Sequence, residues 1–248
     1  MFSSRILLGR TLIFTMLFLA GALLFTGCSL PWQHNTTAVA NGTKPTAQQL
    51  LTALQKNFRG VSAFHVVMKV DNPGSVTAQQ VQIRSANGDV VMPDKVKGQA
   101  TVILSGQSVT VNLISVGGNQ FITDPITGQW RVIKGLLDPR TLTNPDTGIL
   151  SLINKAQNVS QPSDDTVNGV SCWRVTGQLK ARYLAFFTGG GVPAGSMLQM
   201  STCIGKADSL PYQLKVTGQA AAGDTAKTTR TFLLSNYNED VNIAAPKI

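Results

Sequence analysis

Short runs in which apolar and polar residues alternate occupy most of this chain. In one of them Phe64, Val66, Met68 and Val70 share one face, up to the turn that starts at Asp71. Alternation with a period of two is the pattern of a strand that buries one face. The chain is therefore expected to consist mainly of antiparallel strands, each with a dry face and a wet face.

The same pattern recurs along the chain, and short turn-forming segments separate the runs. The further runs are residues 81–84, 96–104, 108–116, 120–123, 170–179, 196–204, 212–217, 228–236 and 241–244. The connecting segments with hairpin residues are 87–89, 105–107, 117–119 and 127–128. Connections this short favour strands that pair with their sequence neighbours in one sheet.

Two or three helices are expected beside the sheet. Thr46 and Gln49 form a capping box, after which Leu50, Leu51, Leu54 and Phe58 make one apolar stripe that ends before Gly60. A second helix is predicted between Pro145 and Lys155, and residues 180–195 are interpreted as a short helix with a mobile Gly-rich loop. So few helices cannot cover both faces of a long flat sheet.

The fold class that follows is α+β, a curled antiparallel sheet or half-barrel with helices in its concave face. If the helices do not fill that face, an apolar cavity remains, and such a cavity is the first place to look for a ligand.

The first 27 residues have the features of an export signal. Arg5 and Arg10 precede an apolar, uncharged run over residues 11–26, which is short for a membrane-spanning helix of roughly 20 apolar residues. Phe25-Thr26-Gly27-Cys28 then resembles the box before the lipid-modified cysteine of bacterial lipoproteins. Cys28 is expected to be a lipidated N-terminus carrying acyl groups such as palmitate; alternatively, it ends an uncleaved anchor.

Both interpretations place the rest of the chain on the extracytoplasmic face of the cell membrane. In the first of them a lipid anchor on Cys28 holds it there. Residues 28–45 are expected to form the lipidated N-terminus and a flexible tether, and residues 46–248 the folded domain. Removal of residues 1–27 leaves 19 basic and 12 acidic residues. This excess of basic residues favours an anionic membrane surface as a partner. The sequence has no basic stripe with interleaved aromatic residues, so it gives no indication of nucleic-acid binding.

Cys172 and Cys203 lie in two strand-like runs of a chain expected to be exported, so a disulfide between them is predicted. Closing a loop of about 30 residues would stabilise the fold by roughly 3 to 4 kcal/mol. Two buried free thiols are the alternative.

The chain offers few groups for chemistry. His34 lies in the tether and His65 on the expected outer face of a strand, so neither a multi-histidine metal centre nor a histidine base is predicted. Gly189-Gly190-Gly191 lacks the Lys-Ser/Thr of a phosphate loop, and Asp164-Asp165 is interpreted as a polar turn. We predict no enzymatic activity and no cofactor or metal.

The order of these features resembles the bacterial LppX/LprAFG lipoprotein family, over roughly residues 46–246. The segments that carry the resemblance are the box ending at Cys28, Ser62–His65, Val96–Ala100, Gly118–Phe121, Thr127–Trp130, Leu142–Ile149, Asp208–Pro211 and Leu234–Glu239. The resemblance implies a half-barrel similar to the LolA and LolB lipoprotein carriers, with a cavity for acyl chains. It also implies a long-chain lipid or triacylated glycolipid as ligand, and an envelope exporter as partner.

A carrier needs no catalytic group, because transfer of an acyl chain from water into a dry cavity contributes about 0.8 kcal/mol per CH2. The candidates for the cavity lining are Leu51, Leu54, Phe58, Phe64, Val66, Met68, Val102, Leu104, Val111 and Leu113. The candidates for a membrane-facing rim are Lys180, Arg182, Phe186 and Phe187. The alternative for these four is a solvated helix whose aromatic side faces the core.

Two other classes of function stay open. A lipid-anchored assembly module that docks on an exporter predicts a filled core and an exposed apolar patch. A hydrolase predicts a Ser or Asp with an aligned base in a cleft, and the chain has no suitable histidine for it.

Overall fold

The computed structural model describes residues 44–248, apart from residues 76, 78–80, 135–143, 145–147 and 189–190 and the side chains of Ile149, Phe186 and Phe187. The described residues belong to one compact unit, Thr36–Ile248. The expected export signal, Cys28 and nearly all of the expected tether lie outside the described residues.

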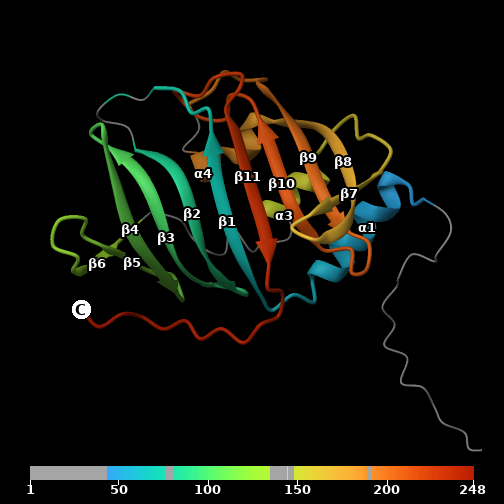
Figure 1. Ribbon diagram of the computed structural model, residues 1–248. Coiled ribbons are helices and arrows are strands. Elements are labelled where there is room, and N and C mark those ends of the chain that lie inside the picture. Colours follow the sequence, from blue (N-terminus) through green and yellow to red (C-terminus); the bar gives the residue numbers. More distant parts are fainter. Residues whose placement is uncertain (1–43, 76, 78–80, 135–143, 145–147, 189–190) are drawn as a thin grey trace, which may run out of the picture. The chain divides into compact units, whose positions relative to one another are not determined.

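The described residues form one sheet of eleven antiparallel strands (Figure 1). The strands are β1 (Ala63–Asp71), β2 (Gln82–Val91), β3 (Lys95–Leu104), β4 (Gln107–Val116), β5 (Asn119–Thr123), β6 (Trp130–Ile133), β7 (Ser163–Val167), β8 (Val170–Lys180), β9 (Met197–Gly205), β10 (Pro211–Thr217) and β11 (Thr229–Ser235). Across the sheet they follow the order β6-β5-β4-β3-β2-β1-β11-β10-β9-β8-β7. The expected antiparallel sheet is confirmed.

This order divides the sheet into two meanders, which we call the first half (β1–β6) and the second half (β7–β11). The halves meet where β1 pairs with β11, and this pairing runs from His65 opposite Ser235 to Asp71 opposite Thr229. Residues from the two ends of the domain therefore lie side by side in the middle of the sheet.

One predicted turn is wrong. Asn87-Gly88-Asp89 lies inside β2, and the chain turns instead at residues 92–94, after Val91. Gly88 sits opposite Gly98 of β3, and a Cβ atom on Gly88 would come within 2.6 Å of the Lys97 carbonyl oxygen. Glycine at this position therefore allows two strands to approach closely. In the sequence alone, a glycine with this role looks the same as a glycine in a turn.

Three further differences concern short segments. Residues 130–133 and 163–167 form strands β6 and β7 that the pattern did not reveal. Asp164 and Asp165 thus belong to a strand and not to a turn. Residues 241–244 form no strand, although Ile243 is only 3% exposed because it packs against Ile114 and Phe121.

The first predicted helix is confirmed as α1 (Ala47–Phe58). Thr46 accepts a hydrogen bond from the Gln49 amide, and the Gln49 side chain accepts one from the Thr46 amide, which completes the capping box. The other helices that the structure describes are α3 (Ile149–Asn154), the 3-10 turn η1 (Ala181–Leu184) and α4 (Ala185–Thr188). In Figure 1, α1 and α3 lie behind the second half of the sheet.

The helices and the second half share one apolar core. Leu54 of α1 and Leu152 and Ile153 of α3 are fully buried, in one cluster with side chains from the sheet. The sheet residues of this cluster that are at most 2% exposed are Val90, Val175, Leu179, Leu198, Met200, Ile204, Leu214, Val216, Phe232 and Leu234. We call the face of the sheet that carries these residues the inner face.

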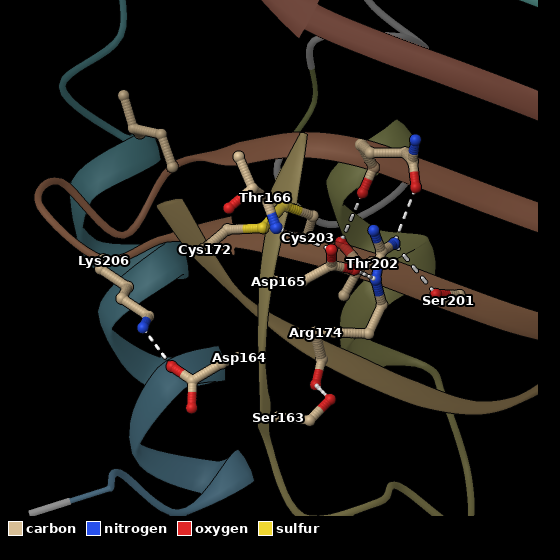
Figure 2. Close-up of a disulfide and its surroundings, with 12 residues drawn as sticks. Ser163, Asp164, Asp165, Thr166, Cys172, Arg174, Ser201, Thr202, Cys203 and Lys206 are labelled. Atoms are coloured by element: carbon tan, nitrogen blue, oxygen red, sulfur yellow. Dashed lines mark hydrogen bonds and ion pairs between the residues drawn. A yellow bond between two sulfur atoms is a disulfide. The ribbon is translucent and has the colours of Figure 1, made fainter. Parts of the chain in front are cut away.

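The opposite, outer face of the second half carries the predicted disulfide. Cys172 of β8 and Cys203 of β9 are bonded and fully buried, with Cα atoms 5.6 Å apart (Figure 2). Beside them Arg174 donates to Asp165 at 2.6 Å. The disulfide joins β8 to β9, and the Arg174–Asp165 pair joins β7 to β8. The pair of Lys206 with Asp164 lies on the inner side, because Asp164 is opposite Trp173.

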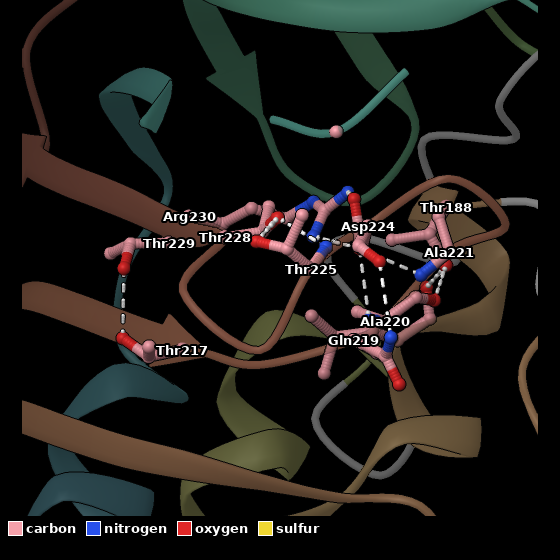
Figure 3. A network of polar contacts seen from close by, with 12 residues as sticks. Thr188, Thr217, Gln219, Ala220, Ala221, Asp224, Thr225, Thr228, Thr229 and Arg230 are labelled. Carbon is pink, nitrogen blue, oxygen red and sulfur yellow. Dashed lines mark hydrogen bonds and ion pairs between the residues drawn. The ribbon is translucent and has the colours of Figure 1, made fainter. Parts of the chain in front are cut away.

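A buried ion pair secures the connection between β10 and β11. Arg230 donates from both terminal nitrogens to Asp224, whose carboxylate also accepts from the amides of Ala220 and Ala221 (Figure 3). The side chain of Asp224 is 0% exposed and that of Arg230 is 8% exposed. Both charges are satisfied only while they face each other.

Candidate functional site

A groove with a volume of about 360 Å³ lies on the inner face of the first half of the sheet. Its residues are Phe64, Val66, Met68, Val81, Ile83, Ala86, Asn87, Gly88, Val90, Val96, Gly98, Gln99, Ala100, Val102, Leu104, Val111, Leu113, Ile122, Pro125, Arg131 and Phe232. All belong to strands or to the segments that adjoin them, and no described helix contributes to the lining. Most of the lining surface is apolar.

The pairing register explains why these side chains line up. One row of direct strand partners crosses the groove and runs Val66, Gly88, Gly98, Leu113, Ile122, Arg131. Residues opposite each other in neighbouring strands point to the same face of a sheet, so this row belongs wholly to the inner face.

The middle of this row holds two glycines. A Cβ atom on Gly98 would collide with the carbonyl oxygen of Asn87, as one on Gly88 would collide with that of Lys97. No side chain can rise from the floor of the groove at this point. The glycines thereby leave depth between the side chains of Val66 and Leu113.

One end of the groove is open to water. Gln82 pairs with Ile103, which brings the next residues, Val81 and Leu104, to the same end. Val81 is 60% exposed and Leu104 is 41% exposed, although both are apolar. An apolar groove with exposed apolar side chains at its mouth is suited to a ligand that is itself apolar.

Among the described residues of the lining, Arg131 alone is charged. Its guanidinium lies 3.5 Å from Asp124, and the side chain is 58% exposed. Asp124 accepts hydrogen bonds from the amides of Thr127 and Ile126, which together with Arg131 lower the pKa of its carboxyl group. This ion pair thus lies at the solvent edge of the groove.

The structure places the ten predicted lining residues in two groups. Seven lie along the groove, namely Phe64, Val66, Met68, Val102, Leu104, Val111 and Leu113. The three from α1 lie elsewhere. Leu54 and Phe58 are buried in the core beneath the second half, and Leu51 packs against that core. Phe58 and Phe64 remain in contact, with ring centroids 5.7 Å apart.

Several lining residues were not identified from the sequence. They include Val81, Ile83, Ala86, Val90, Val96 and Ile122. The alternation that marks Ile83 and Val90 was present, but a β-bulge between Ile83 and Ser85 and the supposed turn at Gly88 interrupted its period.

The predicted rim residues lie at the second half, away from the groove lining. Lys180 ends β8, and Arg182 is exposed in η1. Phe186 and Phe187 belong to α4, but their side chains lie outside the described residues.

The described part of the chain holds no group of three or more His, Cys, Asp and Glu side chains placed to bind a metal ion. His65 lies on the outer face, where its Nδ1 is 2.7 Å from Asp89 Oδ1. Of the helices that the structure describes, none is long and apolar enough to span a membrane.

The chain matches the family model described as LppX_LprAFG lipoprotein over residues 46–243. It is 22% identical over 231 residues to the lipoarabinomannan carrier protein LprG of Mycobacterium leprae (strain TN), a match that covers 90% of this chain and 89% of that protein. Because the family model covers most of the chain, this protein belongs to the LppX/LprAFG lipoprotein family.

Solved structures show the same fold. LprF from Mycobacterium bovis aligns with a TM-score of 0.63 at 18% identity, over 80% of this chain and 96% of that chain. The Mycobacterium tuberculosis lipoprotein LppX aligns with a TM-score of 0.56 at 19% identity, over 80% of this chain and 100% of that chain. The resemblance expected from the order of sequence features is confirmed.

Proposed function

We propose that this protein is an exported, lipid-anchored carrier that holds the acyl chains of a lipid or glycolipid in the groove and moves the lipid across the cell envelope. The observation that carries the proposal is the apolar groove of about 360 Å³ on the inner face of β1–β4. The protein acts by binding and release, without catalysis.

Physical chemistry supports acyl chains as the ligand. The lining offers almost no hydrogen-bond partners, so a polar ligand would lose its water without compensation. An acyl chain has no such loss, and about ten methylenes removed from water contribute roughly 8 kcal/mol. The open end between Val81 and Leu104 leaves room for a headgroup to stay in water.

The similarity to LprG supports a lipid with a sugar-bearing headgroup as the ligand. The match to a lipoarabinomannan carrier protein extends over nine-tenths of the chain. We infer a long-chain lipid or triacylated glycolipid as the ligand class, with an envelope exporter as a further partner.

The N-terminal sequence supports the location. We propose that residues 1–27 are removed on export and that Cys28 then carries the lipid anchor on the extracytoplasmic face of the cell membrane. Residues 29–45 would serve as the tether, and residues 46–248 as the lipid-binding domain. Such a tether would let the groove leave and return to the membrane surface while the anchor stays inserted.

The test is to purify the full chain, extract it with organic solvent and identify the released lipids by mass spectrometry. Val102→Trp places a large ring in the groove and is expected to abolish the co-purified lipid. Thr101→Trp is the matched control, because its side chain leaves the same strand on the outer face. It should keep the wild-type lipid content.

Two results would contradict the proposal. One is wild-type protein that carries no lipid and takes up none from vesicles. The other is equal lipid content in Val102→Trp and wild type, which would place the lipid outside the groove. An assembly module that uses its surface only would give the first result.

A further inference from the structure

Three cationic side chains gather around one tyrosine on the second half of the molecule. The Nζ of Lys155 lies 5.1 Å from the centroid of the Tyr183 ring, and the Cζ of Arg182 lies 5.2 Å from it. Lys180 is near enough to act on the Tyr183 hydroxyl. We call Lys155, Lys180, Arg182 and Tyr183 the cationic cluster.

The cluster is built from segments that the fold holds firmly. Lys155 follows α3, whose Leu152 and Ile153 are fully buried. Arg182 and Tyr183 lie in η1, between Ala181 and Leu184, which are 1% and 0% exposed. The cationic groups themselves are exposed or half-buried. Their arrangement is therefore fixed from beneath and open to a partner from outside.

Like charges in this arrangement repel each other. Since the charged groups of Lys155 and Arg182 both contact one ring, they lie within roughly 10 Å of each other, about one Debye length at 0.1 M salt. Among the described residues, neither Lys180 nor Arg182 has a carboxylate at ion-pair distance. The positive field also lowers the pKa of the Tyr183 hydroxyl, through its hydrogen bond with Arg182 above all.

We propose that the cationic cluster is a docking surface for the anionic phospholipid headgroups of a bilayer. Ammonium and guanidinium groups donate strong hydrogen bonds to phosphate oxygens, and tyrosine is favoured where one end of the ring is dry and the other wet. An anionic surface relieves the repulsion within the cluster. Each cation near such a surface strengthens the interaction about fivefold.

The position of the cluster determines which side of the sheet would face the bilayer. Leu152, Ala181 and Leu184 belong to the same apolar core as Phe64 and Phe232, which line the groove. Lys155 and η1 therefore lie on the inner side of the sheet, which also holds the groove, whereas Lys180 joins the cluster from the end of β8. The inference depends on charge placement alone and stands whether or not the groove holds lipid.

The test uses the protein purified with its N-terminal anchor in place, which is inserted into neutral phosphatidylcholine vesicles. A second set of vesicles contains equal parts of phosphatidylcholine and phosphatidylglycerol, and tethering of the two sets is read from energy transfer between lipid dyes. Wild-type protein is expected to tether the anionic vesicles strongly and purely neutral vesicles weakly. Added salt is expected to weaken the tethering.

The decisive variants carry equal changes of charge inside and outside the cationic cluster. Lys155→Gln, Lys180→Gln and Arg182→Gln together should reduce tethering to the level seen with neutral vesicles, and each alone should reduce it about fivefold. The matched control combines Lys69→Gln, Lys97→Gln and Lys215→Gln, whose exposed side chains leave the outer face. It should tether as wild type does.

Lys155→Arg with Lys180→Arg keeps the charge and should keep the tethering, which separates loss of charge from damage to the fold. The inference is overturned if wild type does not prefer anionic vesicles, if the cluster variant tethers normally, or if both triple variants lose tethering equally. The last result would mean that net charge alone drives the attraction.

Discussion

The two halves of the sheet share one alternating sequence pattern and differ in what covers their inner faces. In the second half, Val175, Leu179, Leu198 and Leu214 are all fully buried beneath α1 and α3. In the first half, the corresponding side chains are often half-exposed, and Leu104 reaches 41%. The same chemistry thus forms a core in one half and a groove in the other.

This difference shows that the local sequence of a strand determines which of its faces is apolar. What covers that face is determined by the tertiary structure. A strand exposes apolar side chains at a cost unless something covers them. The described helices pack mainly beneath the second half, although Phe58 of α1 contacts Phe64 of the first half. We propose that acyl chains, which bind and leave, cover the first half.

The largest effect is expected in the second half, from Asp224→Ala. The substitution leaves the guanidinium of Arg230 buried without its partner and removes the acceptor for two amides. We expect a loss of about 3 to 5 kcal/mol in the free energy of unfolding. Denaturant titration of the variant measures it.

Asp71→Ala is the comparison for this measurement, because it breaks the exposed pair with Lys69. That variant should lose no more than about 1 kcal/mol. Equal losses in the two variants would show that the Asp224 pair is not buried in solution.

The next effect compares core and groove directly. Leu54→Ala removes a fully buried side chain and should cost about 2 to 5 kcal/mol in unfolding free energy. Val102→Ala removes a half-exposed side chain of the groove and should cost about 1 kcal/mol or less, measured without ligand. Similar costs would mean that the first half is as well packed as the second.

A third prediction concerns the floor of the groove. Gly98→Ala places a Cβ atom against the Asn87 carbonyl oxygen, so β2 and β3 must move apart. We expect a loss of roughly 1 to 3 kcal/mol in stability and a lower content of bound lipid in extracts of the purified protein. Gly106→Ala is the control, because this glycine has a positive φ and nothing lies near its position in the β3–β4 turn. It should strain the backbone and leave the lipid content unchanged.

The smallest effect is expected from His65→Gln on the outer face of the first half. Its contact with Asp89 is half-exposed, so stability at neutral pH should change by no more than about 1 kcal/mol. Lipid content should not change, since the residue points away from the groove. A change in lipid content would contradict the assignment of faces.

Local sequence signals predicted a large part of this fold. The capping box at Thr46 fixed the start of α1, and the alternation of Phe64, Val66 and Met68 gave the inner face of β1. Both signals depend only on neighbours in the chain. The disulfide between Cys172 and Cys203 followed from their count and from the expected export of the chain.

The rest depended on contacts between distant segments. The stripe of α1 showed that Leu54 and Phe58 face something apolar, but not which half of the sheet they cover. Gly88 had the same local sequence signal as a turn, and only Gly98 across the sheet reveals its role. Lys155 joins the cationic cluster from a separate helix, which no spacing along the chain could indicate.

Whether the groove holds lipid is tested by locating the bound acyl chain itself. The full chain is loaded with a phospholipid that carries a photoreactive diazirine in its acyl chain, irradiated and digested for peptide mapping. We expect cross-links in β2, β3 and β4, near Ile83, Val102 and Val111. Cross-links confined to the outer face or to α1, or none above the level of Val102→Trp, would contradict the proposal.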